Sequence, residues 1–272
     1  MGIIFPDGKV VAILQEIFSF IASSVPAIQF SLILGPMWLP IIAKNRFFSS
    51  KISGRYGVVL LILSLHFQSA VSQVPVYDEP RHRLELVNPY IRLINVNIAG
   101  HDTTLYHRHF TPSVIVFLSD SHTGSQPSGG QPSFGHSILG QSMFIDFGSS
   151  PVLHRVWNMD TSVYHVMDIE IIDRKEKLEC SPLTEPFIHL EWEKEHVRVY
   201  NIRLGANQST KVDATKCPHL VVMASGIAAI KTGDNAGTTM DAGKFEWMEA
   251  GIRFQIVNNT NKEAKLVMLE LK

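Results

Sequence analysis

The chain contains few charged residues and almost no cysteine, and each scarcity excludes a class of protein. Only 18% of its 272 residues are charged, and the 24 basic residues are balanced by 25 acidic ones. No long basic run stands out, so nothing in the sequence indicates nucleic acid as a partner. The two cysteines, Cys180 and Cys217, are too few for a disulfide framework. The sequence leaves open whether they pair.

The sequence after residue 74 also lacks a long amphipathic helix. Hydrophobic residues make up 45% of the chain, which suits a globular protein with a sizeable core. Short apolar or alternating segments predict strands at residues 90–98, 114–118, 142–147, 154–157 and 163–172. The intervening residues 121–141 are rich in Gly, Ser, Pro and Gln and predict a loop. This pattern of short, punctuated strands favours an all-β barrel or sandwich.

The first 73 residues differ from the remainder. No charged residue occurs from Ile17 to Ile42, and three prolines in this stretch would kink or break a spanning helix. Residues 51–73 then combine basic residues, a short apolar block and Ala70-Val-Ser72 before Gln73. This order is typical of a secretory signal peptide.

Two interpretations of this N-terminal region remain open. In one, the natural start lies further along the chain and residues 1 to about 50 do not belong to the protein. In the other, both apolar stretches are real and hold the protein in a membrane, with the basic segment on the cytoplasmic side. Both predict an extracytoplasmic location for the portion after Gln73, secreted, periplasmic or membrane-anchored. We expect membrane contact only through the N-terminal region.

Two histidines stand just before the strand expected at residues 114–118. His107 and His109 are two residues apart, so an extended backbone would point both imidazoles to the same face. Imidazole is the commonest protein ligand for a transition metal. A pair of this kind is weak evidence alone, and a third ligand would have to come from another strand. His154 is the best candidate.

The second half of the sequence loosely repeats the first at a spacing of about 100 residues. Tyr90-Ile-Arg-Leu is echoed by His196-Val-Arg-Val, and Asn158 is echoed by Asn258. The segment 175–186, which contains charges and two prolines, predicts a linker. We therefore expect an N-terminal region over 1–73 and two β domains over 76–174 and 183–272.

These residues resemble the two short motifs of the cupin superfamily, and their duplication resembles a bicupin. Gly100, His107 and His109 match the first motif, in which Ser113 stands where the family has Glu. His154 and Asn158 match the end of the second motif. The resemblance covers essentially everything after Gln73. It implies two cupin-type β-barrels in tandem, each a double-stranded β-helix or jelly roll.

The second copy resembles a degenerate cupin domain. The positions of its first-motif histidines fall on residues 212–215, which contain none, and Phe254 replaces the third histidine. The resemblance therefore implies a metal-free domain whose role is packing.

The resemblance implies a divalent metal on His107, His109 and His154. Fe(II) is the metal we expect, with Mn, Ni or Zn as alternatives. Three functions stay open: a dioxygenase- or isomerase-like enzyme acting on a small organic molecule, a non-catalytic extracytoplasmic cupin that binds a small ligand or metal, and a pure scaffold. A homodimer is compatible with the family. We assign no general base, and we propose neither Asp168 nor Glu170 as one.

Several other residues are expected to be structural. Phe117, Met143 and Phe147 are expected in the barrel core, with the lining of an apolar pocket as the alternative. His165 is expected as a core histidine with a hydrogen-bond partner, with a position inside the barrel near the metal as the alternative. His122 and His136 are expected to be solvated in the loop.

Overall fold

The computed structural model describes residues 74–172, 177–233 and 237–272. The predictions made for residues 1–73, including the signal peptide, lie outside this range. The described chain is all-β apart from one short turn of 3-10 helix, η2 (Val76–Asp78). No helix in the described part of the chain is both long and apolar enough to cross a membrane.

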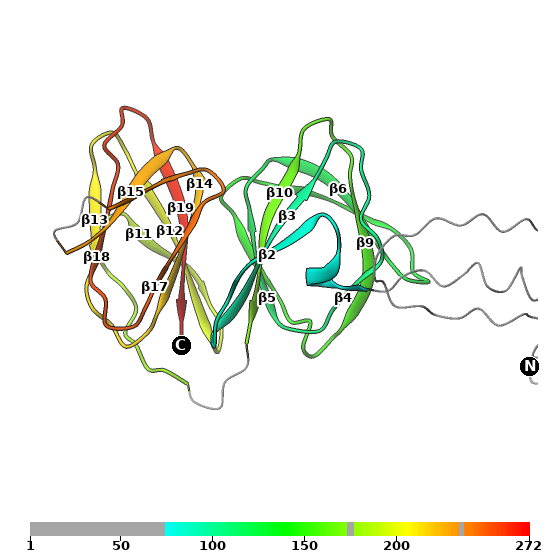
Figure 1. Cartoon of the computed structure of the whole chain (residues 1–272), viewed down its shortest axis with the longest axis horizontal. Coiled ribbons are helices and arrows are strands. Elements are labelled where there is room, and N and C mark those ends of the chain that lie inside the picture. The colour runs from blue at the N-terminus through cyan, green and yellow to red at the C-terminus, as the bar shows by residue number, and fades with distance from the viewer. Residues whose placement is uncertain (1–73, 173–176, 234–236) are drawn as a thin grey trace, which may run out of the picture. The chain divides into compact units, whose positions relative to one another are not determined.

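The strands of the first half form two five-stranded sheets, coloured cyan to green in Figure 1. Sheet A has the order β1-β4-β9-β6-β7, and sheet B has the order β2-β3-β10-β5-β8. The strands are β1 (Val74–Pro75), β2 (His82–Val87), β3 (Ile91–Ile98), β4 (His107–His109), β5 (Ser113–Phe117), β6 (Ser121–Pro127), β7 (Ser133–Ser137), β8 (Ser142–Ile145), β9 (Val152–Asn158) and β10 (Tyr164–Ile171).

The second half repeats this topology strand for strand, apart from β1. Sheet C has the order β11-β12-β19-β14-β17, and sheet D has the order β13-β18-β15-β16. The strands are β11 (Ile188–Glu193), β12 (Val197–Leu204), β13 (Ser209–Val212), β14 (His219–Ser225), β15 (Ile227–Thr232), β16 (Thr238–Asp241), β17 (Phe245–Met248), β18 (Phe254–Val257) and β19 (Ala264–Leu271).

The same asparagine fastens the same turn in both halves. The Asn158 amide donates hydrogen bonds to the carbonyls of residues 98, 99 and 162, at 2.6–3.2 Å. The Asn258 amide does the same to residues 204, 205 and 262, at 2.7–3.0 Å. A second pair is also repeated, because Arg92 binds the buried Glu170 as Arg198 binds the buried Glu270. The loose sequence repeat is therefore a structural repeat.

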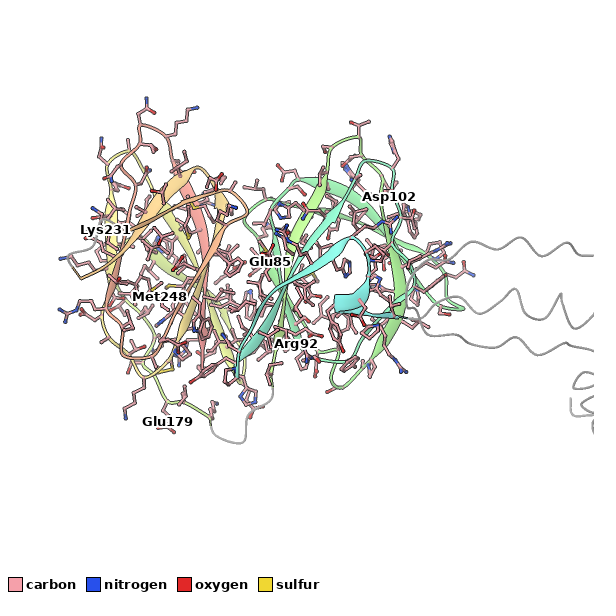
Figure 2. The ribbon with its side chains drawn as sticks, viewed as in Figure 1. Glu85, Arg92, Asp102, Glu179, Lys231 and Met248 are labelled. Atoms are coloured by element: carbon pink, nitrogen blue, oxygen red, sulfur yellow. A yellow bond between two sulfur atoms is a disulfide. The ribbon has the colours of Figure 1, made fainter. Side chains whose placement is uncertain are left out.

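Sheets B and C are buried on both faces. One apolar cluster lies between sheets A and B and another between sheets C and D. A third cluster joins residues of sheet B, such as Leu93 and Ile169, to residues of sheet C, such as Val199 and Leu269. Side chains fill these spaces in Figure 2, where Arg92 is labelled. Burial on both faces explains why β5 and β14 are continuous apolar runs rather than alternating ones.

The predicted loop over residues 121–141 is wrong, because β6 and β7 form an antiparallel hairpin there. Gly124 in β6 is the misleading residue. A Cβ atom at this position would lie 2.0 Å from the indole of Trp157 on β9, so the glycine permits a close approach rather than a turn. His122 and His136 consequently lie opposite each other on strands, with stacked rings 4.4 Å apart.

The two cysteines form a disulfide, which the sequence had left open. Cys180 lies in the segment before β11 and Cys217 lies just before β14, 37 residues later. Replacing both with Ser is expected to lower the free energy of unfolding by about 4 kcal/mol, because the unfolded chain regains the freedom of that loop. Urea denaturation of the variant beside the oxidised and reduced wild type measures this. Equal midpoints for all three would contradict it.

Candidate metal centre

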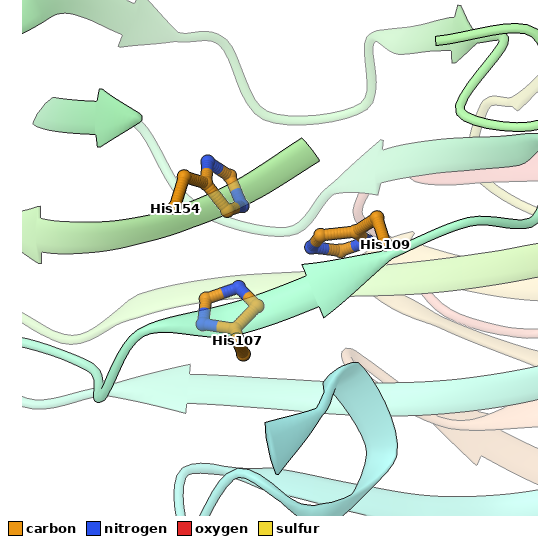
Figure 3. Close-up of side chains that lie close together, drawn as sticks. All are labelled: His107, His109 and His154. Atoms are coloured by element: carbon orange, nitrogen blue, oxygen red, sulfur yellow. The ribbon is translucent and has the colours of Figure 1, made fainter. Parts of the chain in front are cut away.

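Three histidines converge on the inner face of sheet A. His107 lies directly opposite His154 in the antiparallel pairing of β4 with β9, and His109 follows two residues later on the same face. Figure 3 shows the three rings grouped around one point. Their centroids are 4.7–5.1 Å apart, and one ring nitrogen from each lies within 4.8 Å of the other two. The structure thus brings together all three residues predicted from the sequence.

Local contacts determine which nitrogen each ring offers. Nδ1 of His107 donates to the carbonyl of Leu105 at 3.0 Å, and Nδ1 of His154 lies 2.9 Å from the hydroxyl of Ser125. These contacts leave Nε2 of both rings available. Nε2 of His154 is buried and has no hydrogen-bond partner among the described residues. A buried, unpaired imidazole nitrogen facing two others fits a metal ion, because such a nitrogen is costly unless something binds it.

Burial keeps these histidines neutral. It lowers the pKa of His109 to about 2 and that of His154 to about 3, with the neighbouring histidines adding to the effect. The pKa of His107 is also lowered, chiefly by burial. Metal ligation requires neutral imidazole, so protons do not compete for these nitrogens at neutral pH.

Asp168 places a carboxylate beside His109, which the sequence analysis did not foresee. Its Oδ2 lies 3.5 Å from Nδ1 of His109, and both side chains are buried. Burial, opposed by the Ser113 hydroxyl and assisted by the nearby Glu170, raises the pKa of Asp168 to about 7. Carboxylates in this position orient a metal-ligating histidine and fix its tautomer. Alternation along β10 points Asp168 inward, while Glu170 pairs with Arg92.

A fourth imidazole lies behind the three. The ring of His82 on β2 is 4.8 Å from that of His107, and its Nδ1 donates to the carbonyl of Val76 at 2.6 Å. Its Nε2 lies 3.8 Å from the buried carboxylate of Glu79. Burial and then the neighbouring His107 lower the pKa of His82 to about 4. No sequence motif identifies His82, because it comes from the opposite sheet.

A cavity of about 530 Å³ opens beside the three histidines, between sheets A and B. Phe117, Met143 and Phe147 line it, which is the alternative to a purely core role that the sequence had left open. Phe147 also stacks on His109 at 4.4 Å. His165, by contrast, does not line the cavity; its half-buried ring lies 2.9 Å from the amide oxygen of Asn95, so it has the hydrogen-bond partner expected of it.

Among the described residues of the second half, apolar side chains stand where the first half has two of its histidines. Val212 on β13 lies directly opposite Phe254 on β18, in the register that pairs His107 with His154 in the first half. Both side chains are fully buried in the apolar cluster between sheets C and D. That the second copy binds no metal stays a prediction.

Comparison with known proteins identifies the fold. No protein-family model and no curated protein matches the sequence. Among solved structures, salicylate 1,2-dioxygenase from Pseudoaminobacter salicylatoxidans, in adducts with gentisate, is similar with 11% identity, a TM-score of 0.52 and coverage of 78% of this chain and 79% of that one. At this identity the likeness shows the fold alone, and that fold agrees with the cupin-type barrels predicted from the sequence.

Two other solved structures are similar to this chain over most of their length. The bacterial pirin YhhW from Escherichia coli, in complex with nickel(II), has 12% identity and a TM-score of 0.49, over 70% of this chain and 90% of that one. A cupin 2 conserved barrel domain protein from Leptotrichia buccalis has 10% identity and a TM-score of 0.46, over 70% and 88%. At these identities the likeness concerns the fold alone.

Proposed function

We propose that this cupin is a mononuclear metalloenzyme that acts on a small organic molecule. Its two barrels span residues 76–174 and 183–272, and His107, His109 and His154 of the first hold one divalent metal. The convergence of three neutral imidazoles carries this proposal, with His107 and His109 buried and His154 half-buried. Three protein ligands leave coordination positions free, and a bound divalent metal would supply Lewis-acid or oxygen-activating chemistry there.

The chain's own residues would support that chemistry in distinct ways. Leu105 and Ser125 hold the ring orientations of His107 and His154 by hydrogen bonds, and the Asp168 carboxylate lies 3.5 Å from Nδ1 of His109, where a small shift would let it do the same. The apolar walls of the cavity exclude water, which strengthens electrostatic contacts inside. The cavity volume falls within the range of sites that enclose a small molecule.

A non-catalytic binding protein is the second candidate. Ser113 stands where the cupin motif has a carboxylate, and Asp168 is the only acidic residue among the described residues that line the cavity. Because Asp168 already faces His109, no second carboxylate remains to act as a separate base. Turnover of a bound ligand, as opposed to a rise in melting temperature alone, distinguishes the enzyme from the binder.

We also propose that the two barrels lie outside the cytoplasm. The disulfide between Cys180 and Cys217 supports this, because structural disulfides persist in oxidising compartments.

Elemental analysis of the purified full chain tests the metal site. We expect about one equivalent of Fe, Mn, Ni or Zn in the wild type and none in His107→Gln/His109→Gln, which removes two of three ligands. The exposed pair His122→Gln/His136→Gln is the matched control and should retain the metal. A wild type that stays metal-free after anaerobic reconstitution, or a site variant that keeps its metal, would sink the proposal.

A further inference from the structure

We propose that the cavity takes a molecule whose only charged or strongly polar group is the one that meets the metal, and whose body is uncharged and apolar. The polar head of this ligand rests on the proposed metal site. The apolar body rests on the cavity walls alone. The ligand class is therefore an alkyl- or aryl-bearing compound with one oxygen-donor head group.

The polar side chains of the cavity are concentrated at one end. His82, His107, His109, His154 and Asp168 lie together there. Away from them sheet B and β9 contribute aliphatic or aromatic side chains, including Val96, Ile98, Ile115, Phe117, Ile145 and Val156, while β6 and β7 add the small hydroxyls of Thr123, Ser133 and Ser137 and the ring of His136. A ligand with its donor atoms at the histidines would therefore place its remaining atoms against apolar surface, where burial is favourable.

Among the described residues that line the cavity there is neither Lys nor Arg. Arg108 and Arg155 are neighbours of the metal-site histidines in sequence, but strand alternation turns both to the other face of sheet A. Arg108 is exposed, and Arg155 bonds Gln126 and lies over the ring of Tyr106. A carboxylate or phosphate on the ligand body would thus lose its hydration without gaining a Lys or Arg partner among these residues.

One exposed residue of the cavity wall is apolar. Met143 on β8 lines the cavity and is 43% exposed. Phe134 on β7, by contrast, packs edge-on against Trp157 at 5.9 Å, opposite Gly124, on the outer face of sheet A. An exposed apolar side chain in the cavity wall offers apolar compounds a surface to enter by.

Two matched probes test the ligand class on the full chain loaded with Zn(II), which avoids redox reactions. 4-Isopropylcatechol and 3,4-dihydroxybenzoate share the metal-binding catechol and differ in an isopropyl group against a carboxylate of similar size. Calorimetry is expected to show at least tenfold tighter binding of 4-isopropylcatechol. Equal affinities, tighter binding of 3,4-dihydroxybenzoate, or no binding of either would overturn the proposal.

Variants at Met143 sharpen this test without disturbing the core. Met143→Arg introduces a cation at a half-exposed position and is expected to improve 3,4-dihydroxybenzoate binding at least tenfold, whereas Met143→Gln should not. A Met143→Arg variant that leaves the preference unchanged would show that ligands do not reach this wall, contrary to the proposal.

A further pair of probes separates the ligand class from the metal site. 4-Isopropylphenol and 4-hydroxybenzoate do not chelate, so they report on the cavity of the metal-free chain. If elemental analysis finds no metal but 4-isopropylphenol alone raises the melting temperature, the metalloenzyme fails and the apolar cavity stands. If metal is present and the benzoates bind as well as the isopropyl compounds, the ligand class fails and the metal site stands.

Discussion

Replacing Asp168 with Asn is expected to stabilise the metal-free chain while weakening its hold on metal. Burial raises the pKa of Asp168 from 3.8 to about 7, so at pH 8 the folded state carries a carboxylate that its surroundings disfavour. Removing that charge should increase the free energy of unfolding at pH 8 by up to about 4 kcal/mol. Losing the partner of His109 should weaken metal binding roughly 10- to 100-fold. Thermal melts and metal titration measure the two effects.

The stabilisation expected from Asp168→Asn should itself depend on pH. A group whose folded pKa is raised destabilises the fold once it ionises, so the advantage of Asn should shrink on going from pH 8 to pH 5. Glu170→Gln is the matched control on the same strand. Because Glu170 pairs with Arg92, this change should destabilise the chain instead. If Asp168→Asn melted at a lower temperature than the wild type at pH 8, the expected stabilisation would be contradicted.

The metal-free chain is also expected to lose stability steeply as the pH falls below about 6.5. His82, His107, His109 and His154 all have lowered pKa values because they are buried. The unfolded chain binds protons at these imidazoles near pH 6.5 while the folded chain does not. Between pH 6.5 and its lowered pKa, each of His82, His109 and His154 therefore opposes folding by about 1.4 kcal/mol per pH unit, and His107 acts in the same direction. Asp168 acts in the opposite direction and offsets part of the loss.

Urea denaturation of the metal-free chain at pH 8, 7, 6 and 5 measures this dependence. We expect a net loss on the order of several kcal/mol between pH 7 and pH 5. His107→Gln/His109→Gln/His154→Gln should flatten the profile, whereas the exposed pair His122→Gln/His136→Gln should leave it unchanged. If the stability of the triple variant fell with pH as steeply as that of the wild type, the acid-sensitive groups would be other than these three histidines.

The sequence predicted the all-β class and the three converging histidines because both depend on local order. Strand alternation alone puts His107 and His109 on one face, and the repeat of Asn158 at Asn258 identified the duplication. Motif spacing also predicted that Val212 and Phe254 stand at positions where the first half has metal-site histidines. In each case the residues that matter are close in sequence or recur at a fixed offset.

The features that the sequence did not predict depend on pairing between distant strands. His82 and Asp168 come from sheet B and reach the site only because that sheet closes over sheet A. Gly124 suggested a loop because its contact with Trp157 lies 33 residues away in the chain. Phe117, Met143 and Phe147 looked like core residues because hydrophobicity does not distinguish a filled interior from a lined cavity.

The opposed pair Val212 and Phe254 also bears on how this chain can tolerate change. The first half keeps three neutral imidazoles and a disfavoured carboxylate in its interior, and the second half places only apolar side chains at the matching positions. Sheets B and C share one apolar cluster, so the two halves support each other. The second copy therefore adds stability that the first copy does not have to supply. Substitutions in the cavity of the first copy could then change its ligand without unfolding the chain.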